Sequence, residues 1–366
     1  MFKKLKVKRA IKAEVRNYYN SEFCVPVVYC KFGDNGIMYW GRKDEFTTYS
    51  NVISVVYNGV IAAGKVYAQK DETGILAESY FISLKDHKAS HRVNLFLACS
   101  LEKVLYHKYS RDYLATWDGR VENDIIFLPV SSGKVDYSFM ETIISEMEAE
   151  RIAALSVYLT ERGLDNYELT DEEWNAINSL NDLEWEKHRI GKLFDKIKTK
   201  KLTYKAKELP NEPQGNYDLP CLTSSFNNQG LNYYAPRLGA TVLKDVITIP
   251  QNSDVYRAYY QSSEFTVLSD AYAIDWIYDD RKLTREQYLF MVMCINKVTD
   301  LPIYSYKNKL GGWNVVKDKY ILLPEKNGEI DFSFMHTFIS ALEKIAIKDV
   351  VLYTERKIAA TKQVIE

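Results

Sequence analysis

The sequence predicts an α+β protein with two similar domains, each a mixed β-sheet with helices, separated by two long helices that form an antiparallel coiled coil. Three observations predict this fold class. A block of sequence occurs twice, about 195 residues apart. Strand-like apolar runs precede each copy, and a long amphipathic stripe follows each copy. Because a repeat of this length has the size of a domain, each half of the 366 residues should form one module.

The repeated block is most similar around a proline that ends an apolar run. The first copy reads Ile126-Phe-Leu-Pro129 and continues with Asp136-Tyr-Ser-Phe-Met140. The second copy reads Ile321-Leu-Leu-Pro324 and continues with Asp331-Phe-Ser-Phe-Met335. Weaker matches extend upstream in the same order. We therefore expect the same order of elements in both modules.

The elements of the first module follow from local composition and spacing. Residues 20–85 are rich in Val, Ile, Tyr and Phe and are broken by turn residues, which predicts short strands and hairpins. Apolar residues at helical spacing predict a helix over 91–108, and a strand is expected at Asp124–Leu128. We assign 1–135 to domain 1, 136–182 to spacer helix 1 and a connecting helix, 183–330 to domain 2 and 331–366 to spacer helix 2.

Two long amphipathic helices are expected after the two repeats. Asp136 is a good N-cap and Gly163 a good stop, so the first helix has about 26 residues and is roughly 39 Å long. The second begins at Asp331 and extends toward the C-terminus. Pairing the two stripes would bury both. The stripe residues are Met140, Ile144, Met147 and Leu155 in the first helix and Phe338, Leu342 and Ile345 in the second.

The segment between the modules predicts a short connecting helix and one asymmetry. Thr170-Asp-Glu-Glu173 is a capping box that opens a helix. Met1 aligns near Leu193, so the stretch from Trp185 to Lys192 has no counterpart in the first module. The first module therefore lacks the opening segment of the second, and we expect its edge to be incomplete or completed by another chain.

Charge is nearly balanced overall but uneven along the chain. The formal net charge is −1 and the pI about 6.6, whereas a chain that binds nucleic acid by itself usually has a basic excess. Basic runs stand at the head of both modules, which favours phosphate contact over the alternative of an ordinary solvated face. The first run is Lys3, Lys4, Lys6, Lys8, Arg9 and Lys12, and the second is Lys187, Arg189, Lys192, Lys196, Lys198, Lys200, Lys201, Lys205 and Lys207.

Cysteine usage and hydropathy suggest a cytoplasmic protein. The five cysteines form no Cys-x-x-Cys pair, which favours a reducing compartment. The basic N-terminus is followed by no apolar core of a signal peptide, and no run of about 18 apolar residues could span a membrane. We expect no membrane partner.

No catalytic or metal-binding motif is convincing. Gly59-Val-Ile-Ala-Ala-Gly64-Lys65 resembles the start of a phosphate-binding loop, but Val66 stands where Ser or Thr must bind the metal. His87 and His91 have helical spacing without an intervening Glu or a third ligand. We therefore expect neither a catalytic residue nor a metal site on this chain.

The repeated residues resemble a known family. A strand ending in Leu-Pro, a Gly turn, Asp-aromatic-Ser-Phe-Met and a long helix resemble the target-recognition domains of the specificity (S) subunits of restriction–modification systems. The similarity is greatest to the BcgI-like type IIB subunits and the related type I group. Leu219-Pro-Cys-Leu-Thr-Ser-Ser225 and Asn227-Asn-Gln-Gly230 fit the early strand and turn of such a domain. Gly33-Asp-Asn-Gly36 matches this turn only in part.

The resemblance implies a DNA-reading subunit without catalysis of its own. Each domain would read one half of a split site in double-stranded DNA, and the helices would hold the domains apart. The helices would also dock methyltransferase or fused methyltransferase–nuclease subunits, which would carry S-adenosylmethionine and Mg²⁺. The alternatives are a duplicated scaffold for protein interaction that does not bind DNA, and an enzyme with an unrecognised site.

Candidate DNA contacts are polar and basic residues on or near the expected turns, with aromatic neighbours. Arg, Lys, Asn and Gln can read base edges or fix phosphates. In the first domain we select Lys31, Asn35, Tyr39, Arg42, Lys43, Lys65 and Gln69. In the second domain we select Asn227, Asn228, Tyr233, Arg237, Arg257, Gln261 and Lys307.

Overall fold

The computed structural model describes residues 1–365, and for residues 361–365 it describes only the backbone. The chain forms two compact units, Met1–Val157 with the residues from Arg356 onward, and Tyr158–Glu355. Within them we keep the names module 1 for residues 1–135 and module 2 for residues 183–330. The boundaries assigned from the sequence stay predictions.

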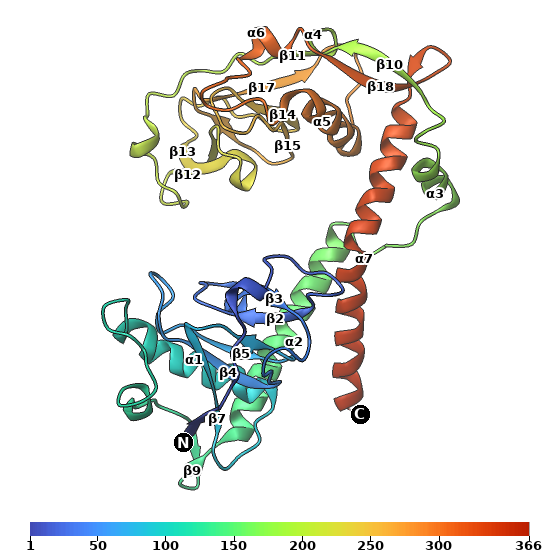
Figure 1. Cartoon of the computed structure of the whole chain (residues 1–366). Coiled ribbons are helices and arrows are strands. Elements are labelled where there is room, and N and C mark those ends of the chain that lie inside the picture. Colours follow the sequence, from blue (N-terminus) through green and yellow to red (C-terminus); the bar gives the residue numbers. More distant parts are fainter. Residues whose placement is uncertain (366) are drawn as a thin grey trace. The chain divides into compact units, whose positions relative to one another are not determined.

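Module 1 contains a four-stranded and a three-stranded sheet (Figure 1). The larger sheet is antiparallel throughout, and its strands in spatial order are β1 (Phe2–Lys4), β7 (Ser79–Leu84), β4 (Val52–Val56) and β5 (Val66–Gln69). The smaller sheet has the order β3 (Ile37–Gly41), β2 (Val25–Val28) and β6 (Gly74–Ile75), with β2 and β6 parallel. Short 3₁₀ turns lie at η1 (Lys12–Glu14), η2 (Asp34–Gly36) and η3 (Val121–Asn123). The β-branched residues of β4 are buried, as expected of a central strand.

Helix α1 (His91–Lys108) covers one face of the larger sheet of module 1, and its bounds confirm the prediction. The Ser90 hydroxyl caps the helix by accepting a hydrogen bond from the Val93 amide at 3.1 Å. Leu97, Leu101 and Leu105, spaced by four residues, lie in one core cluster with residues of β4, β5 and β7. The apolar stripe of α1 therefore joins this sheet into the core of module 1.

Module 2 repeats the strand order of both sheets of module 1. Its larger sheet has the order β11 (Phe194–Lys196), β17 (Ala271–Trp276), β14 (Val246–Pro250) and β15 (Tyr259–Gln261). Its smaller sheet has the order β13 (Leu231–Pro236), β12 (Tyr217–Leu222) and β16 (Thr266–Val267). Its helices and 3₁₀ turns are α4 (Ile190–Leu193), η4 (Ala206–Glu208), η5 (Asn227–Gly230), α5 (Arg285–Thr299) and α6 (Trp313–Val316). The predicted α+β class with two similar domains is confirmed.

The strand predicted at Asp124–Leu128 is absent, and this prediction was wrong. The corresponding segment of module 2 is β18 (Tyr320–Lys326), which pairs with β10 (Glu184–Arg189) and with β19 (Glu329–Ile330). Module 1 forms only the hairpin of β8 (Val130–Ser131) and β9 (Lys134–Val135). A strand needs a neighbour to accept its backbone hydrogen bonds, and no counterpart of β10 lies beside residues 124–128 in the described chain.

Because of this difference between the modules, we expect equivalent substitutions to lower the free energy of unfolding by different amounts. Leu323 of β18 is fully buried, whereas its counterpart Leu128 is half-buried. We expect Leu323→Ala to destabilise module 2 by about 2–5 kcal/mol and Leu128→Ala to destabilise module 1 by less than half of that. Hydrogen exchange of the central strands β14 and β4 would report the two modules separately. Equal losses of stability in the two modules would contradict the explanation that module 1 lacks a neighbouring strand.

Two long helices follow the repeats, as predicted. They are α2 (Tyr137–Glu161) and α7 (Phe332–Ile365). Asp136 and Asp331 cap them, accepting hydrogen bonds from the amides of Phe139 at 2.9 Å and Phe334 at 2.8 Å. The connecting helix α3 (Asp171–Asn178) begins with the predicted Thr170–Glu173 capping box. No helix within residues 1–365 has the length and apolarity needed to cross a lipid bilayer.

The stripe residues of the long helices divide between several environments. Met140 is fully buried in the core of module 1. Phe338 is buried in the core of module 2 and Leu342 packs against that core, so these two support their own module, contrary to the prediction of a shared helical seam. Ile144 and Leu155 are half-buried, while Met147 and Ile345 are 47% and 49% exposed. The coiled coil as a whole and the docking role of Ile144, Met147, Leu155 and Ile345 stay predictions.

Candidate nucleic-acid interface

The turn before β3 and the turn before β13 have the same left-handed backbone. Asn35 has φ 55° in module 1, and Asn228 has φ 46° in module 2. Each turn is held by a tyrosine of the larger sheet. The Tyr67 hydroxyl donates to the Lys31 carbonyl at 3.1 Å, and the Tyr259 hydroxyl donates to the Phe226 carbonyl at 3.0 Å. Asn and Gly tolerate this conformation, which explains why they occupy both turns.

A glutamine also anchors each turn from the sheet below. The Gln69 side-chain amide donates to the Asn35 carbonyl and to the Ser54 hydroxyl, both at 2.9 Å. Gln261 repeats these bonds to the Gln229 carbonyl at 3.1 Å and the Thr248 hydroxyl at 2.9 Å. Gln69 is 1% exposed, so the predicted DNA contact of Gln69 was wrong. Both glutamines position the turns, and Gln261 is half-buried in the same role.

The turn residues themselves are presented to solvent. Asn35, Asn227 and Asn228 are all exposed. The Asn35 side chain makes one long bond, 3.3 Å, to the Ala68 carbonyl. Exposed amide side chains on a rigidly anchored turn can donate to and accept from base edges. These three residues remain candidates for base contacts.

A second duplicated feature is a short basic segment that follows β1 in module 1 and its counterpart β11 in module 2. We call Lys6-Val7-Lys8-Arg9 and Lys198-Thr199-Lys200-Lys201 the basic segments. In both, the cations are exposed and the intervening residue is half-buried. None of these six cations has an ion-pair partner within residues 1–365. Each segment therefore carries three positive charges within four residues, and no described carboxylate pairs with them.

The same hydrogen bond fixes both basic segments. The Lys8 amide donates to the Thr47 hydroxyl at 3.0 Å, and the Lys200 amide donates to the Thr241 hydroxyl at 2.8 Å. Thr47 lies in the loop after β3 and Thr241 in the loop after β13. Neither threonine was selected from the sequence. A residue-by-residue comparison of the two modules would have found them, because they lie in the loops after the equivalent strands β3 and β13.

The predicted arginines lie in these same loops, each paired with carboxylates. Arg42 pairs with Glu22 at 2.7 Å and with Glu45 at 3.4 Å. Arg237 pairs with Glu264 at 2.8 Å and with Asp218 at 3.1 Å. Such exposed pairs contribute little to stability, so an arginine can exchange a carboxylate for a phosphate at small cost.

Other predicted cations fall into free, paired and enclosed groups. Lys43 and Lys307 are exposed, and among the described residues neither has an ion-pair partner. Lys31 pairs with Asp34 at 2.5 Å, and Arg257 pairs with Asp300 at 2.7 Å. Lys65 is enclosed, as its side chain is 13% exposed and pairs with Glu102 at 2.8 Å. A DNA contact by Lys65 is therefore not supported, and its place is structural.

The predicted contacts fall at two ends of each module. Asn228 precedes β13 and Arg237 follows it, so about six residues of extended chain, roughly 20 Å, separate them. Asn35 and Arg42 flank β3 in the same way. Tyr39 and Tyr233 lie within these strands and are half-buried. Each module therefore has two ends. The turn end carries the asparagines. The basic end carries the basic segment and the loop with Arg42 or Arg237.

In module 2, hydrogen bonds join the turn end to two further loops. The Ser253 hydroxyl donates to the Ser224 carbonyl at 2.9 Å, which ties the loop after β14 to the turn. The Tyr306 amide donates to Asp254 at 2.8 Å, which brings in the loop that carries Lys307. The turn, the loop after β14 and the loop after α5 therefore form one connected surface. Loops held on a rigid scaffold in this way commonly carry binding residues.

A family model described as the type I restriction modification DNA specificity domain matches residues 182–353. The matched range begins just before β10 and ends within α7. Residues 182–353 are thus similar to this domain. The resemblance to restriction–modification specificity subunits, predicted from the sequence, is thereby confirmed. The matched range contains all seven predicted contacts of module 2, together with the second basic segment.

Two kinds of relatives are similar to the chain beyond this domain. The specificity subunit S.BcgI of a type II restriction enzyme of Heyndrickxia coagulans is 24% identical over 232 residues, covering 61% of this chain. The match spans 59% of that subunit's own length. The S subunit of a type I restriction–modification system of M. genitalium covers 99% of this chain and 91% of its own, with 13% identity and a TM-score of 0.57. This likeness shows a shared fold.

A third relative is the HsdS subunit of Thermoanaerobacter tengcongensis. It covers 86% of this chain and 78% of its own, with 14% identity and a TM-score of 0.30.

Proposed function

We propose that this chain is the DNA-reading subunit of a cytoplasmic restriction–modification complex, and that each module reads one half of a bipartite site in double-stranded DNA. The observation that carries the proposal is the recurrence of the basic segment. Three cations with the same spacing, exposed and without ion-pair partners among the described residues, occupy equivalent places in the two modules. Core packing does not require exposed cations, whereas phosphate contacts do.

Position and specificity would be divided between the two ends of each module. The basic segments, with Arg42 and Arg237 beside them, would contact phosphates and fix the orientation of the duplex. The turns with Asn35, Asn227 and Asn228 would read base edges. This division would explain the duplication, because two modules with different amino-acid sequences can recognise two different half-sites.

In this proposal, catalysis belongs to the partner subunits. The sequence holds no recognised catalytic motif, and within residues 1–365 no group of three or more His, Cys, Asp and Glu side chains could hold a metal. Methyltransferase or fused methyltransferase–nuclease subunits would bind S-adenosylmethionine and Mg²⁺ and dock on the long helices α2 and α7.

The first prediction concerns activity of the chain by itself. We expect no methyl transfer from S-adenosylmethionine to DNA by the purified chain, and site-specific methylation when its modification subunit is added. The measurement is incorporation of labelled methyl groups into genomic DNA. A modification subunit incubated without this chain is the control. Methyl transfer by the chain alone would refute the proposed division of roles.

The second prediction concerns the recognised sequence. We expect a bipartite site with half-sites about one DNA turn apart, because 25 residues of α2 span roughly 38 Å and a DNA turn roughly 34–36 Å. Methylome sequencing of a host with and without the gene would reveal the site. A continuous recognised sequence would contradict the two-reader arrangement.

Matched variants would assign the half-sites to the modules. Asn228→Gly and Asn35→Gly each remove one side-chain amide while keeping a residue that accepts positive φ. Each variant should alter the methylation of one half-site only, and the two should alter different halves. Asn327→Gly, a change of the same type at an exposed positive-φ position in the turn between β18 and β19, serves as a control for general loosening. The scaffold alternative predicts that no variant changes methylation.

A further inference from the structure

Lys4 and Lys196 occupy equivalent places in the two modules. Each is the last residue of the edge strand of the larger sheet, β1 in module 1 and β11 in module 2. The Lys4 ammonium lies 5.7 Å from the centre of the Tyr80 ring, and the Lys196 ammonium lies 5.3 Å from the centre of the Tyr272 ring. These two lysines can therefore be compared directly.

The residues that face the two lysines are also equivalent. Trp117 and Trp313 each pack edge-on against the tyrosine below the lysine, with ring centres 6.1 Å and 6.2 Å apart. The residue after the tryptophan is Asp118 in module 1 and Asn314 in module 2. Asp118 and Asn314 are therefore counterparts, and they differ by one negative charge.

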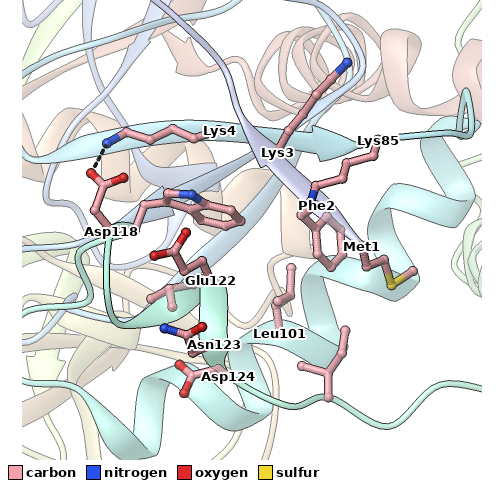
Figure 2. Close-up of a pocket in the computed structure, with 13 residues that line it drawn as sticks. Met1, Phe2, Lys3, Lys4, Lys85, Leu101, Asp118, Glu122, Asn123 and Asp124 are labelled. Carbon is pink, nitrogen blue, oxygen red and sulfur yellow. Dashed lines mark hydrogen bonds and ion pairs between the residues drawn. The ribbon is translucent and has the colours of Figure 1, made fainter.

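This difference decides whether the lysine is neutralised. In module 1 the Lys4 ammonium lies 3.2 Å from a carboxylate oxygen of Asp118, as Figure 2 shows. In module 2 the amide of Asn314 carries no charge, and Lys196 has no ion-pair partner among the described residues. The positive charge of Lys196 is therefore available to a ligand, whereas that of Lys4 is compensated within the chain.

A pocket of about 260 Å³ lies beside Lys196, and its lining consists mainly of hydrogen-bond donors. The ammonium of Lys196 and the indole N–H of Trp313 can only donate, and the amides of Gln251 and Asn314 can both donate and accept. None of these four side chains has a hydrogen-bond partner among the described residues, and no carboxylate lines the pocket. Unpaired donors around an uncompensated cation fit an anion.

The size of the pocket limits the anion to a small group. Pockets that enclose drug-sized molecules have volumes of roughly 300–1,000 Å³. The pocket beside Lys196 is smaller than this range. A single phosphate group suits it better than a whole nucleotide does.

The pocket is continuous with the surface that we assign to DNA. Lys196, Lys198 and Lys200 are exposed, while Ile197 and Thr199 between them are half-buried, so the three lysines project from the same side of an extended segment. This row spans about 13 Å. One end is bonded to the loop after β13, and the other lies at the pocket, which the residue after β14 helps to line. The row thus connects the basic end of module 2 with the loop that is bonded to its turn.

We propose that the pocket beside Lys196 binds one phosphate group of the DNA backbone, in addition to those contacted by the basic segment. The ammonium makes a charge-assisted hydrogen bond to the phosphate, and the neutral donors complete its coordination. Module 1 has no such site, because Asp118 compensates Lys4 and Tyr57 stands where module 2 has Gln251. This inference rests on the proposed function and adds a phosphate contact that only module 2 makes.

The first test transfers the carboxylate of module 1 to module 2. Asn314→Asp in the full chain should weaken the binding of a labelled duplex roughly tenfold at about 0.1 M salt. It should also reduce the slope of log K against log salt by about 0.9, the contribution of one phosphate. Fluorescence anisotropy at several salt concentrations measures both. Asn314 is exposed, so the melting temperature should stay nearly unchanged.

A matched control adds the same charge elsewhere on module 2. Asn327→Asp changes an exposed residue in the turn between β18 and β19. Because salt screens a charge that does not contact the phosphate, this variant should change the affinity by less than about twofold. Equal losses in the Asn314→Asp and Asn327→Asp variants would overturn the proposal.

Two further variants distinguish a phosphate in the pocket from a lysine that acts only as a surface charge. Lys196→Gln should reduce the salt slope by about 0.9, as Asn314→Asp does. Gln251→Ala removes a neutral donor, so it should weaken binding several-fold and leave the slope nearly unchanged. A loss of affinity in Lys196→Gln combined with full affinity in Gln251→Ala would overturn the pocket as the binding site.

Inorganic phosphate distinguishes the DNA backbone from a free phosphate as the source of the group. We expect calorimetry of the full chain without DNA, at constant ionic strength, to show no phosphate binding tighter than about 1 mM. Tighter binding that Asn314→Asp abolishes, with unchanged affinity for the duplex, would assign the pocket to a free phosphate and overturn the proposal. If the unmodified chain bound no duplex, the proposed function would fail as well. An Asn314→Asp variant that binds the duplex as tightly as the unmodified chain would refute this inference alone.

Discussion

Reversing the charge of Lys198, Lys200 and Lys201 together is expected to weaken the binding of duplex DNA by roughly 10²–10³-fold at about 0.1 M salt. Each neutralised phosphate contributes a slope of about −0.9 to the dependence of log K on log salt, so three lost contacts remove about 2.7 from the slope. The three side chains are exposed, so their replacement by Glu should not disturb folding. The effect should therefore appear in binding and leave the melting temperature nearly unchanged.

The measurement is the fluorescence anisotropy of a labelled duplex at several salt concentrations. Because phosphate contacts do not depend on sequence, any duplex serves and the recognised site need not be known. A control variant with Lys282, Lys297 and Lys326 changed to Glu alters net charge equally, and these exposed lysines lie on other parts of module 2. An equal loss of affinity in both variants would mean that net charge decides binding, and would remove the special role of the basic segment.

Replacing Lys344 with Met is expected to destabilise the unit that contains module 2 by about 3 kcal/mol. The Lys344 ammonium lies 2.8 Å from a carboxylate oxygen of Glu173 and 3.0 Å from the Glu168 carbonyl. Both charged side chains are largely buried, at 16% and 8% exposure. Removing the cation leaves a buried carboxylate without its counter-charge, which is the costly way to break such a pair. The same contact docks α3 on α7, so its loss should also loosen α3.

The pH dependence of stability provides a second readout of this pair. Burial by itself would raise the pKa of Glu173, but hydrogen bonds from Lys344 and the Thr170 amide outweigh burial and lower the pKa below its ordinary value of 4.5. A lowered pKa in the folded state means that the contribution of the pair is fully present above about pH 4.5 and is lost as pH falls through the lowered pKa. Lys344→Met should therefore flatten the loss of stability below that pH.

Suitable controls lie on the same helix and in the same pair. Lys348 is one turn further along α7, is exposed, and lies 5.9 Å from the Tyr167 ring, so Lys348→Met should cost less than about 1 kcal/mol. The double variant Lys344→Met with Glu173→Gln removes the uncompensated charge and should recover part of the loss. Urea denaturation gives the free energy of unfolding for each variant. A Lys344→Met protein as stable as the Lys348→Met protein would contradict the buried pair.

The sequence by itself predicted the duplication, the α+β class, the bounds of α1 and the starts of both long helices. These features depend on local signals. Repeated motifs are visible without a structure, the spacing of Leu97, Leu101 and Leu105 defines a helical face, and Asp136 and Asp331 cap helices through contacts three residues away. The family resemblance rests on the same repeated motifs.

The candidate site could be predicted only in part. The exposed turn residues Asn35, Asn227 and Asn228 and the two basic runs were found because turn chemistry and charge are local properties. Gln69 and Lys65 were misjudged because their partners, the Asn35 carbonyl and Glu102, lie 34 and 37 positions away in the chain. Polarity alone does not tell whether a side chain faces solvent or a distant partner.

Only the tertiary structure showed where the two modules, despite similar sequences, differ in structure. Residues 124–128 and 319–323 have similar sequences, yet only the second forms a strand, because only module 2 has β10 beside it. Likewise Phe338 and Leu342 have the spacing of a helical seam, but they pack in the core of their own module. Strand formation and burial depend on which neighbour supplies hydrogen bonds and apolar surface. That neighbour lies more than 130 residues away in the chain for β18, beyond the reach of any local pattern.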